Sequence, residues 1–191
     1  MKLVILDRDG TVNPHSDESI QSPEEWTALP GALEAIARLN HAGFHVVIAS
    51  DQSGLGRGLF DVVSLNAIHT KMHKQLAACG GRVDAVFYCP HSPEEPCLCR
   101  LPVPGLFEQI GERFGVELEG VPVCADNAAY LCAAAGVGCV PHLVLTGLAA
   151  ELDPAHLPAG FPPTTQVHAN LTAFAEAVIA QGALPAAPAV S

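Results

Sequence analysis

The sequence predicts a single α/β domain built on a parallel sheet that is covered by helices on both faces. Three observations predict this fold: apolar runs of strand length recur along the chain, segments with helical spacing separate them, and 191 residues suit one domain. A domain of this size buries roughly 70% of the surface that its unfolded chain exposes. We expect the domain to span residues 1–180 and residues 181–191 to form a disordered, Ala/Pro-rich tail.

Five runs predict the strands. Each is short and dominated by apolar residues, as buried strands of a parallel sheet are. In chain order they are Leu3–Leu6, Phe44–Ala49, Val83–Tyr88, Val121–Ala125 and His142–Leu145.

Four segments with helical spacing lie between these strands, and Pro30-Gly31 precedes the first of them. They are Ala32–Ala42, Val62–Cys79, Gly105–Phe114 and Ala128–Ala135. The intervals after the first two strands are too short to hold a large cap domain. We therefore expect a site that is open or covered only by loops.

The charge of the chain excludes two classes of partner. Nine Lys and Arg residues against twenty Asp and Glu residues give a formal net charge of −11, without a basic patch. Such a surface repels nucleic acid and anionic membrane. The run Leu3–Leu6 is too short for a signal-peptide core, and no segment approaches the ~20 apolar residues of a membrane span. We expect a soluble, cytoplasmic monomer that acts on a small molecule.

The cysteine pattern indicates a metal site. Of seven cysteines, Cys89, Cys97 and Cys99 fall within eleven residues and flank His91. Three thiolates and an imidazole in this spacing can close a tetrahedron around Zn²⁺, although a chance cluster is the alternative. The other cysteines are expected to be buried, reduced thiols: Cys79, Cys124, Cys132 and Cys139.

Polar residues follow four of the predicted strands. Ligands bind at the carboxyl ends of parallel strands, so these residues should meet along one rim. The groups are Asp7 and Asp9, Ser50 and Asp51, Cys89 onward, and Asp126.

Asp7 and Asp9 are the strongest candidates for chemistry. They lie two residues apart where a buried strand ends, and in an extended chain both side chains project to the same side. Two carboxylates placed in this way can hold a divalent cation and attack phosphorus, and Gly10 lets the backbone turn beneath them. The alternative is a pair of solvated aspartates before a turn.

The order of these motifs resembles the haloacid dehalogenase superfamily, whose domains are Rossmann-like. The resemblance rests on Leu6-Asp-Arg-Asp-Gly-Thr11, on Ser50-Asp-Gln-Ser-Gly-Leu-Gly-Arg-Gly58, and on Cys89-Pro-His91 with Cys97-Leu-Cys99-Arg100. The last motif narrows the match to the zinc-loop phosphatases, which include phosphatases of a heptose bisphosphate and of histidinol phosphate. The resemblance covers about residues 1–147.

The resemblance implies a role for each residue at the rim. Asp7 would be the nucleophile that forms an aspartyl-phosphate, and Asp9 the general acid and then base. Asp126 would complete a Mg²⁺ site with Asp7 and the Asp9 carbonyl. Ser50 would stabilise the phosphoryl group. Substrate would be bound by Asp51, Gln52, Ser53, Arg100 and Asn127.

The zinc of the related phosphatases is structural, which agrees with four filled coordination positions at Cys89, His91, Cys97 and Cys99. Arg100 directly follows the last ligand. The resemblance implies that the loop holds its planar guanidinium toward a second phosphate or a ring hydroxyl of the substrate.

Four positions depart from the pattern of the related enzymes. Leu101 replaces a lysine that screens the phosphoryl oxygens, and Tyr130 replaces a carboxylate that holds this lysine. Asp51 replaces an asparagine, so an acceptor-only anion replaces an amide donor. Asn127 stands where a lysine or another polar residue often occurs. The loss of one preorganised donor typically costs ~10²–10³ in rate.

Three functions remain open from the sequence. The first is a Mg²⁺-dependent sugar-phosphate phosphatase that removes the C7 phosphate of a heptose 1,7-bisphosphate, weakened by Leu101, Tyr130 and Asp51; Arg57 and the chain length favour it over the histidinol-phosphate branch. The second is a degenerate member that binds a phosphorylated metabolite or a partner without turnover. The third is a histidinol-phosphate phosphatase.

Three further side chains are given structural interpretations. Trp26 is expected to pack a loop at the surface rather than to contact substrate. His69 and His73 share one face of a predicted helix, where we expect packed or solvated side chains rather than a metal pair.

Overall fold

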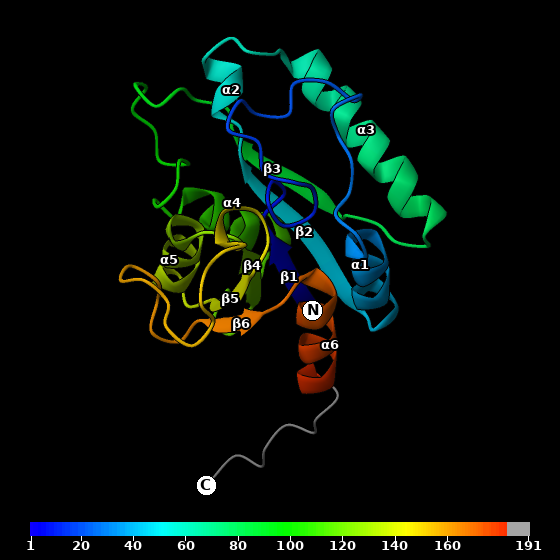
Figure 1. Ribbon diagram of the computed structural model, residues 1–191, viewed down its shortest axis with the longest axis vertical. Helices are drawn as coiled ribbons and strands as arrows, with labels where there is room; N and C mark the ends of the chain where they lie inside the picture. The colour runs from blue at the N-terminus through cyan, green and yellow to red at the C-terminus, as the bar shows by residue number, and fades with distance from the viewer. Residues whose placement is uncertain (183–191) are drawn as a thin grey trace, which may run out of the picture.

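The computed structural model describes residues 1–182 and contains a parallel six-stranded sheet of order β3-β2-β1-β4-β5-β6 (Figure 1). The strands are β1 (Lys2–Leu6), β2 (Phe44–Asp51), β3 (Ala85–Cys89), β4 (Pro122–Ala125), β5 (Val140–Val144) and β6 (Gln166–His168). The helices are α1 (Ala32–His41), α2 (Ser53–Gly56), α3 (Val62–Ala78), α4 (Gly105–Phe114), α5 (Ala128–Gly136) and α6 (Leu171–Gly182), with a 3₁₀ turn η1 (Gly147–Ala149).

Each face of the sheet has its own hydrophobic core. Side chains alternate along a strand, so Val4 and Leu6 of β1 pack against α1, α3 and α6, whereas Leu3 and Ile5 pack against α4 and α5. Figure 1 shows these two groups of helices on opposite sides of the sheet. The central strand β1 is therefore buried on both faces, and its carboxyl end is held rigidly where Asp7 and Asp9 follow.

The predicted strands and helices are confirmed, with ends within two residues of those observed. Residues 7–31 and 52–61 hold only loops and the four-residue α2, in agreement with the absence of a large cap domain from this part of the structure. The edge strand β6 and the helix α6 were not predicted. Gln181 and Gly182 belong to α6, and the rest of the expected tail lies outside the described residues.

Within residues 1–182, no helix is long and apolar enough to cross a membrane. All seven cysteines are free, but Cys132 is exposed and Cys79 is half-buried, so only Cys124 and Cys139 are buried thiols as expected outside the Cys/His group. Cys132 lies on α5, where its thiol donates to the Gly160 carbonyl at 3.0 Å.

A histidine pair joins the last two strands. His142 Nδ1 of β5 lies 2.9 Å from His168 Nε2 of β6, and both rings lie against Phe174 of α6. One ring nitrogen must donate and the other accept, so the pair cannot carry two full charges without losing this bond. Burial, together with the neighbouring His168, lowers the pKa of His142 to about 4.

This depressed pKa predicts acid sensitivity at the β5–β6 edge. A histidine with a lowered folded-state pKa stabilises the fold above its unfolded pKa near 6.5, and this contribution is lost as the pH falls toward 4. We expect the free energy of unfolding to fall by about 2 kcal/mol between pH 7 and pH 5 through His142 alone. Urea unfolding of wild type and His142→Asn at both pH values isolates this contribution. The exposed His73→Asn should keep the wild-type pH slope, and an unchanged slope in His142→Asn would refute the assignment.

Candidate active site

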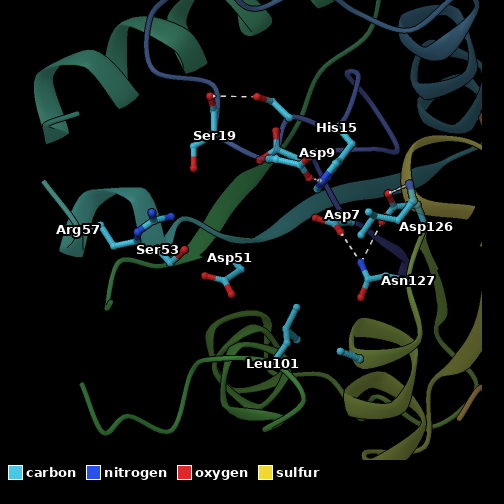
Figure 2. Close-up of a pocket in the computed structure, with 14 residues that line it drawn as sticks. Asp7, Asp9, His15, Ser19, Asp51, Ser53, Arg57, Leu101, Asp126 and Asn127 are labelled. Carbon is cyan, nitrogen blue, oxygen red and sulfur yellow. Dashed lines mark hydrogen bonds and ion pairs between the residues drawn. The ribbon is translucent and has the colours of Figure 1, made fainter. Parts of the chain in front are cut away.

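A cleft of about 370 Å³ opens at the carboxyl ends of β1, β2 and β4 (Figure 2). Six residues expected at the site line it: Asp7, Asp9, Asp51, Ser53, Asp126 and Asn127. Its other lining residues are His15, Ser16, Asp17, Ser19, Arg57, Leu101, Ala129 and Leu148. The convergence of the strand ends therefore brings most of the expected residues into one cavity.

Asp7 is buried at the base of the cleft. Its Oδ1 accepts a hydrogen bond from the backbone N–H of Arg8 at 2.7 Å, which fixes the carboxylate orientation. Burial, followed by the charges of Asp126 and Asp9, raises the pKa of Asp7 well above its usual value. Asp7 is thus a carboxylate in a position that a cation would stabilise.

Asp126 lies beside Asp7 and is held on both oxygens. Its Oδ2 accepts from the backbone N–H of Leu148 at 2.8 Å, and its Oδ1 accepts from Asn127 Nδ2 at 2.9 Å. Gly10, at a φ of +83°, lies so close that a Cβ there would overlap Asp126 Oδ2. The glycine of the Asp-Gly motif is therefore required both for the turn and for the approach of Asp126.

Asn127 has two functions. It caps α5, since its Oδ1 accepts from the backbone N–H of Tyr130 at 3.0 Å, and this bond fixes which end of the amide is the NH₂ group. The NH₂ group then points at the acidic pair, 2.9 Å from Asp126 Oδ1 and 3.4 Å from Asp7 Oδ2. Figure 2 shows it bridging the two aspartates.

Asp9 is surrounded by four N–H donors. Oδ1 accepts from Arg8 Nε at 2.9 Å and Asn13 Nδ2 at 2.8 Å, and Oδ2 accepts from Arg8 Nη2 and Gln52 Nε2, both at 3.0 Å. A carboxylate has about four acceptor positions. Asp9 must therefore release at least one donor before it can carry a proton to another group.

Arg8, the fully buried partner of Asp9, is itself positioned by His69 of α3. Arg8 Nη1 lies 3.2 Å from His69 Nε2, and arginine can only donate, so this nitrogen accepts and the imidazole is neutral. Burial, then the charge of Arg8, lowers the pKa of His69 to about 4, which is consistent with this protonation state. His69 is packed and His73 is exposed, in line with the expectation of packed or solvated side chains.

Trp26 corrects an expectation. It is fully buried rather than packed at the surface, and its Nε1 donates to Asn13 Oδ1 at 3.1 Å. Lys71 of α3 donates to the carbonyls of Pro23 and Trp26 at 2.6 and 2.7 Å. The loop between β1 and α1 is thereby fastened to α3, and through Asn13 it supports Asp9.

Ser50 and Gln52 are almost fully buried behind the cleft wall. Gln52 Nε2 lies 2.7 Å from Ser50 Oγ and 3.0 Å from Asp9 Oδ2. Its Oε1 accepts from Arg8 Nη2 at 3.3 Å. Gln52 therefore connects the end of β2 to the acidic pair, whereas Ser53 and Asp51 form the cleft surface.

No lysine lines the described cleft next to Asp51. One oxygen of Asp51 is buried without a hydrogen-bond partner among the described residues, and burial raises the pKa of this carboxyl. The neighbouring Leu101 is apolar. The three lysines lie elsewhere: Lys2 over the Phe44 ring, Lys71 on carbonyls of the β1–α1 loop, and Lys74 exposed on α3.

Arg100 is directed toward its own loop. Its guanidinium donates to the backbone carbonyls of Ser92, Pro93 and Glu95. These bonds close the loop that carries the Cys/His group. Arg100 does not line the cleft of the described structure, although its charge lowers the pKa of Asp51 against the larger effect of burial.

Tyr130 fills its position as a core side chain. It is fully buried, its hydroxyl donates to the Ala49 carbonyl at 3.0 Å, and its ring makes an edge-to-face contact with Phe107 at 5.2 Å between centroids. A carboxylate here would lie among apolar side chains, with no lysine at Leu101 to pair with it. Leu101 and Tyr130 thus replace both members of the lysine–carboxylate pair of the related enzymes, and neither leaves an unpaired charge.

This packing predicts a large effect for Tyr130→Asp. The substitution removes the aromatic ring from the core and buries an unpaired carboxyl, so the free energy of unfolding should fall by about 3–5 kcal/mol. Tyr130→Phe removes only the bond to Ala49 and should cost about 1 kcal/mol. Urea unfolding of both variants measures this difference. Equal stabilities of Tyr130→Asp and wild type would contradict the packing role.

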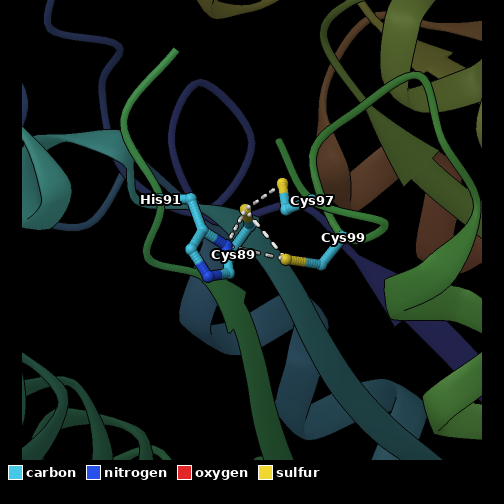
Figure 3. A group of neighbouring side chains, drawn as sticks. All are labelled: Cys89, His91, Cys97 and Cys99. Carbon is cyan, nitrogen blue, oxygen red and sulfur yellow. Dashed lines mark hydrogen bonds between the residues drawn. The ribbon is translucent and has the colours of Figure 1, made fainter. Parts of the chain in front are cut away.

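The Cys/His group forms a second site above the end of β3 (Figure 3). The ligand atoms of Cys89, His91, Cys97 and Cys99 all lie within 4.8 Å of one another. Cys89 Sγ is 3.8 Å from Cys97 Sγ and 3.5 Å from His91 Nδ1, close to the ~3.5–3.8 Å between ligands of a tetrahedral Zn²⁺. Cys89 and Cys99 are nearer, at 3.0 Å, but well beyond the ~2.05 Å of a disulfide.

The donor set of this group fits a soft divalent cation. Three sulfurs and one imidazole nitrogen with no oxygen ligand are typical of zinc. Burial raises the pKa of Cys89 to about 12, so its thiol would not ionise at neutral pH without a nearby cation. The predicted ligands are thus brought together in the expected arrangement.

Sequence reasoning missed the contribution of the β1–α1 loop and of Arg57 to the cleft. His15, Ser16, Asp17 and Ser19 come from the loop, and Arg57 is the C-cap residue of α2. The loop residues had no periodic signal, and the bonds that Trp26 makes to fasten this loop are tertiary contacts. Arg57 was visible in the sequence, but only as a mark of similarity.

Comparisons with known proteins agree with this geometry. The family model for polynucleotide kinase 3 phosphatase matches residues 2–151. The chain is 52% identical to the D-glycero-beta-D-manno-heptose-1,7-bisphosphate 7-phosphatase of Bordetella bronchiseptica, over 94% of this chain and 98% of that protein. Its identity to the protein of the same name from Pseudomonas aeruginosa is 42%, over 93% and 97%.

A solved structure of such a phosphatase is also similar to this chain. The B. bronchiseptica D,D-heptose 1,7-bisphosphate phosphatase, crystallised with magnesium and phosphate, superposes with a TM-score of 0.90 at 51% identity. The match covers 95% of this chain and 99% of that chain. The similarity therefore extends through both the cleft and the Cys/His loop.

Proposed function

Because this chain belongs to the D-glycero-D-manno-heptose-1,7-bisphosphate 7-phosphatase family of the haloacid dehalogenase superfamily, we propose that it hydrolyses the C7 phosphate of that sugar bisphosphate. One observation carries the proposal: a cleft in which Asp7, Asp126 and Asn127 converge, in a chain that is 52% identical to such a phosphatase over nearly its whole length.

Asp7 attacks phosphorus in this mechanism. Its orientation is set by the Arg8 N–H, and the attack forms an aspartyl-phosphate while the C7 oxygen of the sugar departs. Asp9 gives a proton to this oxygen and then takes one from the water that hydrolyses the intermediate. Because four donors occupy Asp9, its release from Asn13 or Gln52 precedes proton transfer.

Mg²⁺ fits the acidic end of the cleft. The donors proposed to hold it are the carboxylates of Asp7 and Asp126 and the carbonyl of Asp9, an all-oxygen set suited to a hard cation. The raised pKa of Asp7, caused by burial and by the nearby Asp126, supports a cation at this point. When bound, Mg²⁺ would neutralise phosphate charge during the transfer.

We assign a structural role to Zn²⁺ at Cys89, His91, Cys97 and Cys99. All four positions of a tetrahedron are filled by protein, which leaves none for substrate. The end of this loop carries Leu101 to the wall of the cleft. Reduced thiol ligands suit the cytoplasm, where we propose that the enzyme acts.

A second candidate is a member that binds a phosphorylated metabolite with little turnover. It is favoured by Leu101 and Asp51, which leave the cleft without the lysine of related enzymes and add a carboxylate. The test is phosphate release from heptose 1,7-bisphosphate and from histidinol phosphate, with Mg²⁺ and with a chelator. The proposal expects Mg²⁺-dependent release with preference for the bisphosphate. Binding of the bisphosphate without release would favour the second candidate, and preference for histidinol phosphate would contradict the assigned substrate.

A further inference from the structure

Arg57 is the one Lys or Arg side chain among the residues that line the cleft, against five aspartates, at positions 7, 9, 17, 51 and 126. Arg57 is exposed, and within residues 1–182 no hydrogen bond or ion pair engages its guanidinium. A cationic side chain that shares a cavity with carboxylates yet pairs with none is available for an anionic ligand.

The position of Arg57 is fixed by the backbone. It is the C-cap residue of α2, and its N–H donates to the Ser53 carbonyl at 3.0 Å. The preceding Gly56 lies against residues 90–92 of the Cys/His loop, so closely that a Cβ there would overlap Ser92 N. Only the flexible side chain of Arg57 is therefore free to move.

Arg57 lies far from the reacting end of the cleft. In Figure 2 it stands at one end, whereas Asp7, Asp126 and Asn127 stand at the other, with Asp51 and Leu101 between. Arg100 donates to carbonyls of its own loop and does not line the cavity. The cleft thus has a nucleophilic end and a separate cationic end.

We propose that Arg57 is the specificity residue that binds the phosphate of the substrate that is not transferred. This inference rests on the proposed function, in which the sugar carries two phosphates. Each phosphate monoester carries about −1.5 to −2 charges at pH 7, and the guanidinium fork matches two of its oxygens. With one phosphate at Asp7, the sugar ring places the other toward the opposite end of the cleft.

The test measures binding without turnover. The probe is a hexose 1-phosphate, titrated with Mg²⁺ and saturating inorganic phosphate to fill the Asp7 end. Arg57→Gln should weaken its binding about 10- to 100-fold, the usual effect of losing a charge-assisted pair. Arg57→Lys, which keeps the charge but loses the fork, should weaken it less. Binding of inorganic phosphate alone should be unchanged in both variants.

Arg113→Gln is the matched control. Arg113 is exposed in the last turn of α4 and does not line the cleft, so this variant should bind the probe as wild type does. Equal binding by Arg57→Gln and wild type would overturn the inference, as would an equal loss for inorganic phosphate. Because these readouts need no catalysis, they separate an error about Arg57 from a failure of the proposed function, which appears only as absent phosphate release.

Discussion

Replacing Asp7 with Asn should abolish phosphate release and, at the same time, raise the melting temperature of the metal-free protein. The amide cannot form the aspartyl-phosphate, and loss of a nucleophile typically lowers kcat by about 10⁴-fold or more. Stability should change in the opposite direction, because burial and the charges of Asp126 and Asp9 raise the pKa of Asp7 and so oppose its ionised form. Asn keeps an oxygen to accept from the Arg8 N–H.

The gain in stability should be measurable as a higher melting temperature. Each kcal/mol of burial penalty and repulsion that is relieved corresponds to a rise of roughly 2–4 °C in Tm for a chain of this length. The measurements are phosphate release with Mg²⁺ and thermal unfolding with a chelator. The control is Asp153→Asn, since His156 lowers the pKa of this exposed carboxyl and no gain is expected there. Activity retained by Asp7→Asn would contradict its role as nucleophile, and a lower Tm would contradict the electrostatic account.

Loss of the Zn²⁺ proposed at the Cys/His group should disable the enzyme without changing the acidic pair. Cys97→Ser should reduce bound zinc from about one equivalent to almost none, because the remaining three ligands hold it weakly. The loop of residues 89–101 would lose its anchor, and with it the position of the rim at Leu101. We expect a loss of several kcal/mol in stability, about 10 °C in Tm, together with most of the activity.

Cys132→Ser provides a matched control for this experiment. Cys132 is exposed and lies outside the Cys/His group, so its replacement should leave zinc content, Tm and activity unchanged. Metal analysis, thermal unfolding and phosphate release should be measured on the same preparations. A Cys97→Ser protein without zinc but with wild-type Tm would refute the structural role.

The central part of the fold was predictable because two local features of the sequence determine it. Apolar runs such as Leu3–Leu6 are buried on both faces of the sheet, and polar residues follow them directly. The edge was missed for a physical reason: β6 is a three-residue, half-buried strand without an apolar run. Helix α6 carried a readable signal, since Asn170 caps it and Leu171, Phe174 and Val178 repeat at helical spacing.

The candidate site was predictable where residue type dictates chemistry. Asp7 and Asp126 lie close together in the cleft, as the motifs indicated. The four Cys/His ligands likewise lie together in their own group. Residues whose role depends on tertiary contacts were not predictable. Trp26 supports Asp9 through Asn13, and Arg100 is engaged by carbonyls of its own loop. No local sequence pattern predicts the direction in which the side chains of Trp26 and Arg100 point.

In the proposed mechanism, Asp7 removes the C7 phosphate while the other phosphate is held at the far end of the cleft. Phosphorus-31 NMR during turnover of heptose 1,7-bisphosphate with Mg²⁺ tests this most directly. We expect the C7 resonance to decay as inorganic phosphate appears and the C1 resonance to persist as that of a sugar 1-phosphate. Decay of the C1 resonance first, or two unchanged resonances in the presence of intact protein and Mg²⁺, would contradict it.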